Sequence, residues 1–292
     1  MTEADRGVRL EGAPEPHKMI PASGGVQVAA DVYGHSGPLV ILQHGGGQTR
    51  HAWKGAGQKL AEAGYLAVSL DARGHGDSDW APDGDYSTDS LVEDLVAIVE
   101  HLGQRPILVG ASMGGGTSLT AVGEARVAAE ALVLVDTAPQ IEIGGVRKIR
   151  NFMGQAPDGF TSLEEVAEAI SNYQPHRKRS RNLEGLAKNV RLWPDGRYRW
   201  HWDPEFMRRK GSIADRVRRQ EEAAKNIGCP SLLVRGGLSD VLSEEGAQAY
   251  LELVPHSEYA NVGDAAHMVA GDRNDVFVSS VLSFLSKVAP SN

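Results

Sequence analysis

Short apolar runs recur along the chain, and each has the length and composition of a β-strand. Pro38–Leu42 is continuously apolar, which is typical of a strand covered on both faces. Similar runs predict strands over Tyr65–Leu70, Pro106–Val109, Ala131–Val135, Pro230–Val234 and Ser257–Val262. Val26–Val32 alternates in part between apolar and polar positions, so we expect an antiparallel edge strand there.

Helical spacing of apolar residues appears between these runs. A predicted helix begins at Ser87–Ser90 and carries on one face Leu91, Leu95, Ile98 and Leu102. Further helices are predicted near Trp53–Ala63, after Gly115, and over Ser243–Leu253 and Asn274–Val288. Alternating strands and helices indicate right-handed crossovers, and therefore an α/β fold with a mostly parallel sheet flanked by helices.

The alternation stops between about Thr137 and Ser212, where no convincing strand is found and aromatic residues are frequent. We therefore predict a core of residues 21–137 and 213–292, interrupted by a helical cap at 138–212. Residues 1–20 mix charges with Pro and Gly, so we expect a flexible N-terminal arm.

Composition narrows the class of protein. The 292 residues are 41% hydrophobic and 23% charged, with a net charge of −8, which disfavours nucleic acid as a partner. The first twenty residues lack the apolar core of a signal peptide, and no apolar run approaches the roughly 18 residues that span a bilayer. The single cysteine, Cys229, cannot form an intrachain disulfide, so a cytoplasmic protein is the default expectation. The oligomeric state is left open, with a homodimer as one form.

The segment Gly110–Gly114, with sequence Gly-Ala-Ser-Met-Gly, joins a predicted strand to a predicted helix. At such a turn the backbone is strained and the hydroxyl of Ser112 is lifted clear of the sheet. Glycine is needed at 110 and 114 because a Cβ there would collide with the neighbouring strand or helix. The following N–H groups lie at a helix N-terminus, which favours an oxyanion. We interpret Ser112 as a nucleophile.

A serine nucleophile needs a general base and an acid that orients it. His267 follows the last predicted strand, so we expect it at the same sheet edge as Ser112. For the acid we favour Asp240, because the preceding Gly236-Gly237 turn gives its side chain room to reach across this edge. Asp136 is the main rival; Asp264 and Asp272 are weaker candidates.

The order Ser112, Asp240, His267 resembles the α/β-hydrolase superfamily, whose strand-to-helix serine turn is present here. Two further landmarks of that superfamily are His44-Gly45-Gly46-Gly47-Gln48 and the segment Asp71–Ser78. The resemblance implies an eight-stranded type of sheet and an oxyanion hole formed by the N–H groups of Met113 and Gly46, with Gly47 as an alternative donor. We expect structural roles for His44, His75 and Arg73.

Serine at position 112, where some subfamilies carry aspartate, implies an acyl-enzyme formed from an ester, lactone, thioester or amide. No metal-ligand cluster, dinucleotide fingerprint or Walker loop is found, so we expect no cofactor and no metal. The leading hypothesis is a hydrolase of small carboxylic esters. Lactonase, C–C bond hydrolase and cofactor-free perhydrolase activities remain alternatives, as does a receptor that binds a small ligand without catalysis.

The predicted cap suggests the character of the substrate. Its many aromatic side chains exceed what a small segment can bury internally, so we expect one or two of Trp193, Trp200 and Trp202 to face Ser112, in a pocket that also includes Gly47. Residues 138–212 contain 14 Lys/Arg and 9 Asp/Glu, so this segment is cationic within an acidic chain. An anionic substrate is therefore one hypothesis, although the basic run His176–Arg181 is also typical of a solvated surface.

Overall fold

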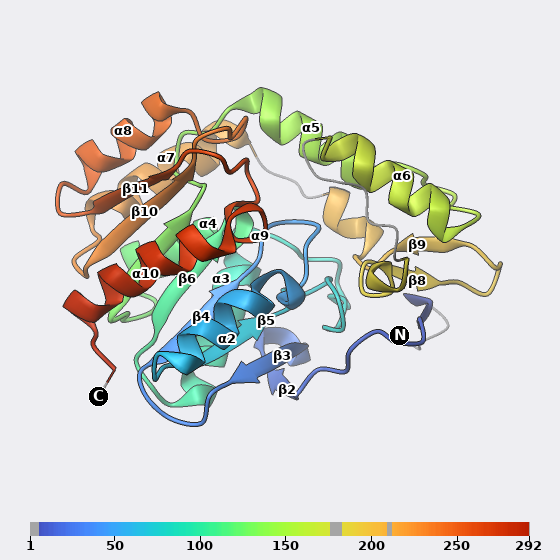
Figure 1. The fold of residues 1–292 in the computed structure, drawn as a ribbon, viewed down its shortest axis with the longest axis horizontal. Coiled ribbons are helices and arrows are strands. Elements are labelled where there is room, and N and C mark those ends of the chain that lie inside the picture. The colour runs from blue at the N-terminus through green and yellow to red at the C-terminus, as the bar shows by residue number, and fades with distance from the viewer. Residues whose placement is uncertain (1–5, 176–182, 209–211, 292) are drawn as a thin grey trace.

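The computed structural model describes residues 6–175, 183–208 and 212–291. A sheet of eight strands runs through its centre in the order β11-β10-β7-β6-β4-β5-β3-β2 (Figure 1). The strands are β2 (Lys18–Pro21), β3 (Gln27–Tyr33), β4 (Leu39–Gln43), β5 (Leu66–Leu70), β6 (Ile107–Ala111), β7 (Ala131–Val135), β10 (Ser231–Gly236) and β11 (Glu258–Val262). The predicted α/β class with a mostly parallel sheet is confirmed, because only β2 and β3 run antiparallel to their neighbours.

Helices cover both faces of the sheet. One apolar cluster joins strand side chains to α3 (Thr88–Leu102), α4 (Met113–Gly123), α7 (Ile213–Lys225) and α8 (Glu244–Leu253). A second cluster, on the opposite face, joins the strands to α2 (Lys54–Glu62), α9 (Val269–Asp272) and α10 (Asn274–Val288). Neighbouring β4 residues divide between the clusters, Ile41 to the first and Val40 and Leu42 to the second, as the alternation of a strand requires.

Helix α3 forms where the sequence pattern placed it. The Ser87 hydroxyl accepts a hydrogen bond from the Ser90 N–H, which satisfies one of the free donors at the helix start. Leu91, Leu95 and Ile98 are buried, as their spacing predicts. None of the described helices is long and apolar enough to cross a bilayer.

Residues 138–212, which we call the inserted segment, contain two strands that the sequence pattern did not predict. Helices α5 (Ile143–Met153) and α6 (Leu163–Tyr173) precede the 3-10 turn η3 (Glu184–Leu186), and β8 (Val190–Leu192) and β9 (Tyr198–Trp200) form an antiparallel hairpin before η4 (Pro204–Arg208). The expectation that this stretch lacks strands is wrong, because strands of three residues with a central arginine are too short to show a strand pattern. Its apolar side chains form a third cluster, which includes Met153, Phe160, Trp200, Trp202 and Phe206.

The described part of the N-terminal segment is paired with the rest of the protein rather than loose. Strand β1 (Val8–Arg9) adds to the β8–β9 hairpin, and β2 adds to the edge of the main sheet. The expectation of a flexible arm over residues 1–20 is therefore wrong for the residues from 6 onward. Strand β1 has two residues and a distant partner, and β2 has four residues of which only Ile20 is buried, which is why local composition did not reveal them.

Candidate active site

Ser112 lies on a sharp turn between β6 and α4. Its backbone has φ 46° and ψ −110°, a conformation that non-glycine residues rarely adopt. A Cβ added to Gly110 would lie 2.5 Å from the Gly114 carbonyl carbon, and one added to Gly114 would lie 2.6 Å from Gln43. The expected steric need for glycine at both positions is thus confirmed, and the close packing holds the strained serine at the end of its strand.

His267 lies on the loop between β11 and α9, and Asp136 directly follows β7. His267 Nδ1 and Asp136 Oδ2 are 2.7 Å apart. The Asp136 side chain is fully buried, and its Oδ1 accepts a 2.8 Å hydrogen bond from the Gly236 N–H. The Ser239 hydroxyl donates to Oδ2. This carboxylate is therefore held in place by two donors besides the imidazole.

The prediction that Asp240 pairs with His267 is wrong. Asp240 is half exposed and its Oδ2 lies 2.7 Å from Lys148 Nζ. The preceding turn is bound to the β11 side of the sheet, since the Gly237 N–H donates to Val262 O and the Leu238 N–H donates to Ala265 O. These hydrogen bonds fix the backbone before residue 240, so the Asp240 side chain does not reach across the sheet edge. The Gly-Gly turn instead provides the Gly236 N–H that donates to Asp136.

Two of the three glycine N–H groups in the turn after β4 are bound to nearby side chains. The Gly45 N–H donates to Gln48 Oε1 at 3.0 Å and the Gly47 N–H to His75 Nε2 at 3.1 Å. Among the described residues, the N–H of Gly46 has no acceptor. The turn is bound to the serine helix, since the Gly114 N–H donates to His44 O at 3.2 Å.

Three buried histidines stabilise the loops around this turn. Ring nitrogens of His44, His75 and His201 accept hydrogen bonds from the N–H groups of Ala72, Gly47 and Gly76, respectively. Burial lowers the pKa of His44 and holds that of His201 well below its usual value, which favours the neutral rings that can accept these bonds. The sequence interpretation missed His201, because it lies in the inserted segment and far from any motif.

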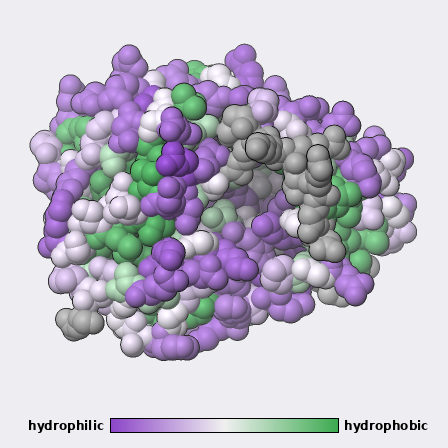
Figure 2. Space-filling model, in the orientation of Figure 1, coloured by the Kyte–Doolittle hydropathy of each residue, from purple (hydrophilic) through white to green (hydrophobic). Residues whose placement is uncertain are grey.

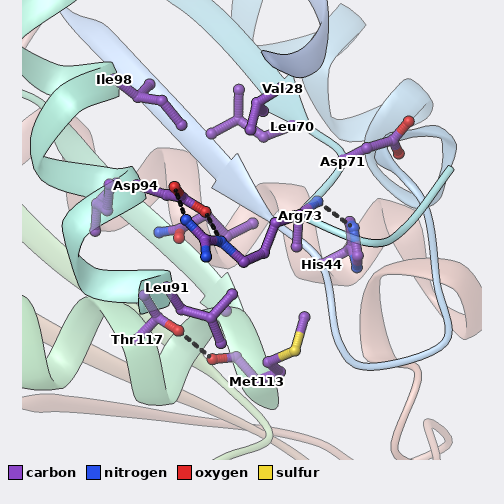
Figure 3. A pocket seen from close by; sticks show the side chains of 14 residues that line it. Val28, His44, Leu70, Asp71, Arg73, Leu91, Asp94, Ile98, Met113 and Thr117 are labelled. Atoms are coloured by element: carbon purple, nitrogen blue, oxygen red, sulfur yellow. Dashed lines mark hydrogen bonds and ion pairs between the residues drawn. The ribbon is translucent and has the colours of Figure 1, made fainter. Parts of the chain in front are cut away.

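Beneath the serine turn, a small internal cavity of about 30 Å³ is bordered by Met113, Thr117 and His44 (Figure 3). Arg73 points across it to Asp94 of α3, with Nε–Oδ2 and Nη2–Oδ1 distances of 2.5 and 2.6 Å. This paired arrangement agrees with a bracing role for Arg73. A cavity of this size holds about two water molecules and is too small for a substrate.

A much larger cavity, of about 1040 Å³, lies between the sheet and the inserted segment. Ser112, His267, Gly46 and Met113 all line it. The face shown in Figure 2 is mainly hydrophilic and is hollowed near its middle. Gly47, Trp200 and Trp202 line the cavity, as expected, together with apolar side chains that include Ile143, Val146, Ile149, Phe152 and Met153.

Trp193 is not part of the cavity lining. Arg199 lies over its ring at 4.7 Å from the ring centre, and Gly7 packs so closely that an added Cβ would lie 2.6 Å from the indole. The expectation that Trp193 lines the pocket is therefore wrong. Its position next to β1 explains this, because the N-terminal strand covers that side of the hairpin.

Comparison with known proteins agrees with the fold described above. A family model described as alpha/beta hydrolase fold matches residues 38–273. Esterase Rv0045c of Mycobacterium tuberculosis is 26% identical over 265 residues, covering 88% of this chain and 86% of that protein. The sn-1-specific diacylglycerol lipase ABHD11 of Mus musculus is 24% identical over 260 residues, covering 85% and 81%.

Two solved structures extend the comparison. The structure of the M. tuberculosis esterase Rv0045c has a TM-score of 0.73 at 26% identity, covering 94% of this chain and 93% of that one. The structure of E-2-(acetamidomethylene)succinate hydrolase has a TM-score of 0.78 at 22% identity, covering 92% and 98%. At that lower identity the likeness concerns the fold alone.

Proposed function

Because the chain belongs to the α/β-hydrolase family, we propose that it hydrolyses carboxylic esters through an acyl-enzyme on Ser112. The observation that carries the proposal is the pairing of His267 with buried Asp136 at 2.7 Å, in the cavity lined by the strained Ser112. The curated relatives named as an esterase and a diacylglycerol lipase support an ester as the bond that is cleaved.

In the first half of the reaction, the Ser112 hydroxyl attacks the ester carbonyl while His267 Nε2 takes its proton. Asp136 accepts the Nδ1–H of His267, which fixes the tautomer and stabilises the imidazolium. The N–H groups of Gly46 and Met113 donate to the oxyanion. Met113 is the first residue of α4, so its N–H has no acceptor within the helix.

The first half ends when His267 gives this proton to the departing alcohol, which leaves Ser112 as the acyl-enzyme. In the second half, His267 activates a water molecule. Water adds to the acyl carbon, the Ser112 ester bond breaks, and the carboxylic acid leaves. We propose that the inserted segment forms the roof of the cavity and limits the access of bulk water during these steps. Trp200 and Trp202 would contact the apolar part of the ester there.

Labelling with a fluorophosphonate probe tests the nucleophile. We expect mass spectrometry to place the probe on Ser112 and hydrolysis of p-nitrophenyl pentanoate to be lost in Ser112→Ala. Ser283→Ala, on the exposed side of α10, is the matched control and should keep full activity. Unlabelled Ser112, or tight binding of small apolar ligands with no turnover of any ester, would contradict the proposal and favour a receptor.

A further inference from the structure

The large cavity has an unbalanced set of charged side chains. Among the described residues that line it, four carry a positive charge, and none is an Asp or a Glu. The four are Arg147, Arg150, Lys188 and Arg216. Arg147 and Arg150 are exposed on α5, whereas Lys188 and Arg216 are half-buried. Removing a cation from water costs free energy unless an anion pairs with it. Lys188 and Arg216 therefore favour an anionic ligand in the cavity.

Arg216 differs from Arg218 and Arg219, the other two arginines of α7, because both of those form ion pairs. On α7, Arg218 lies 2.7 Å from Asp215, and Arg219 lies 2.6 Å from both Asp89 and Glu124. Among the described residues, no carboxylate pairs with Arg216, and burial lowers its pKa with no opposing acid. Carboxylates therefore pair with the other arginines of α7, but no described carboxylate pairs with Arg216, which lines the cavity.

Arg216 also lies close to the serine helix. Gln220, one turn further along α7, has its Nε2 2.6 Å from the position that a Gly116 Cβ would occupy. Gly116 lies in the first turn of α4, the helix that begins directly after Ser112. The Gly116 N–H donates to Ser112 O at 2.9 Å. Arg216 therefore lies on the nucleophile side of the cavity, about one helical turn from these contacts.

Lys188 also lines this cavity. Burial is the main cause of the low pKa of His51, and the positive charge of Lys188 is a minor cause in the same direction. His51 lies in the turn η2 (Arg50–Trp53) and also lines the cavity. Burial lowers the pKa of Lys188 itself, and the next cause is another cation, Lys54. Among the side chains that the structure describes, no carboxylate pairs with Lys188.

We propose that Lys188 and Arg216 bind an ionised acid group of the substrate, so that the preferred ester carries a second, free carboxylate. The inference rests on the proposed function and specifies its substrate class. The ester C–O bond is cleaved by water to give an acid and an alcohol, while the second carboxylate is only bound. The acid group supplies the negative charge that the cavity lining lacks.

Two esters of equal length test the proposal. In p-nitrophenyl hemiglutarate a carboxylate replaces the terminal methyl of p-nitrophenyl pentanoate. We expect kcat/KM, corrected for spontaneous hydrolysis, to be at least about 10-fold higher for the hemiglutarate, since hydrogen bonds to charged groups are the strong ones. Added salt should lower kcat/KM for the anionic ester alone.

Variants assign the effect to the two residues. Arg216→Gln and Lys188→Gln should each remove most of the preference for the hemiglutarate and leave kcat/KM for the pentanoate within about two-fold, since the neutral ester needs no cation. Matched controls are Arg218→Gln on the same helix and Lys59→Gln on α2, both at exposed ion pairs. These controls should keep the full preference.

Three outcomes are distinguishable. Equal kcat/KM values for the two esters, or a preference that persists in both variants, would overturn the charge inference and leave the proposed function intact. If neither ester is hydrolysed, the proposed function fails. The charge inference is then decided by calorimetric binding of the two intact esters to Ser112→Ala, where equal Kd values overturn it and tighter binding of the hemiglutarate supports it.

Discussion

Asp136 Oδ2 lies 2.7 Å from Nδ1 of His267, although 131 residues separate the two in sequence. The contact crosses the carboxyl end of β10, which lies between β7 and β11 in the sheet. Asp136 has φ 49°, so both Ser112 and the carboxylate on the neighbouring strand have positive φ. Backbone strain is concentrated at functional sites, which agrees with a catalytic role for both residues.

Asp136→Asn should lower kcat by up to about 10⁴-fold, because an amide cannot hold the Nδ1–H tautomer or stabilise the imidazolium. Asp240→Asn removes only a half-exposed ion pair with Lys148 and should leave kcat within about two-fold. Steady-state kinetics on p-nitrophenyl pentanoate compares the two variants, with circular dichroism as the folding check. A larger loss in Asp240→Asn would show that the carboxylates have been assigned the wrong way round.

His75→Phe should lower kcat by about 10- to 100-fold with little change in KM. The ring is fully buried and accepts the Gly47 N–H, so its loss frees the turn that carries Gly46, whose N–H we propose as an oxyanion donor. Phenylalanine keeps the edge contact with Phe206, whose ring centre lies 4.6 Å away. The exposed variant His256→Phe is the control, and a His75→Phe enzyme with unchanged kcat would show that the hydrogen bond does not position the turn.

Stability should fall as the pH drops below about 6.5, the ordinary pKa of histidine. Burial lowers the pKa of His44, His51 and His201, to about 4 for His51. These rings stay neutral in the folded protein but take up protons when it unfolds, so their contribution is complete above pH 6.5 and is lost as the pH falls towards 4. Each proton changes the unfolding free energy by about 1.4 kcal/mol per pH unit.

Urea unfolding between pH 7.5 and 5 measures this slope. His51→Gln removes one of the three titrating groups, so below pH 6.5 it should reduce the slope by at most about 1.4 kcal/mol per pH unit. The exposed variant His256→Gln should leave it unchanged. An unfolding free energy that stays constant over this range would contradict the assignment of neutral, buried rings.

Arg50→Met should destabilise the protein by about 3–5 kcal/mol. The guanidinium is fully buried and lies 2.9, 2.6 and 2.8 Å from Asp31, Asp71 and Asp77, so its removal leaves three carboxylates without their shared cation. Chemical unfolding provides the measurement, and Arg126→Met, at an exposed pair with Glu93, should change stability by less than about 1 kcal/mol. Equal effects of the two substitutions would rule out a special role for the buried cluster.

The sequence predicted those parts of the fold that depend only on residues adjacent in the chain. Apolar runs such as Ala131–Val135 gave the central strands, and the glycines around Ser112 gave the serine turn, because each depends on adjacent residues. The choice between Asp136 and Asp240 depended on how the 236–240 loop is fixed against the end of β11. That information lies in backbone hydrogen bonds between distant segments, which no local pattern contains.

The strand β1 changes how the inserted segment can move. A segment inserted into a chain is normally tethered only where it enters and leaves, and it can swing about those two points. Here β8 has two further tethers, the pairing with β1 and the 2.7 Å contact of Arg191 with Asp77 in the loop after β5. We therefore expect the hairpin end of the segment to move less than α5 and α6 when a substrate enters the cavity. Amide hydrogen exchange should consequently be slower in β8 than in α5.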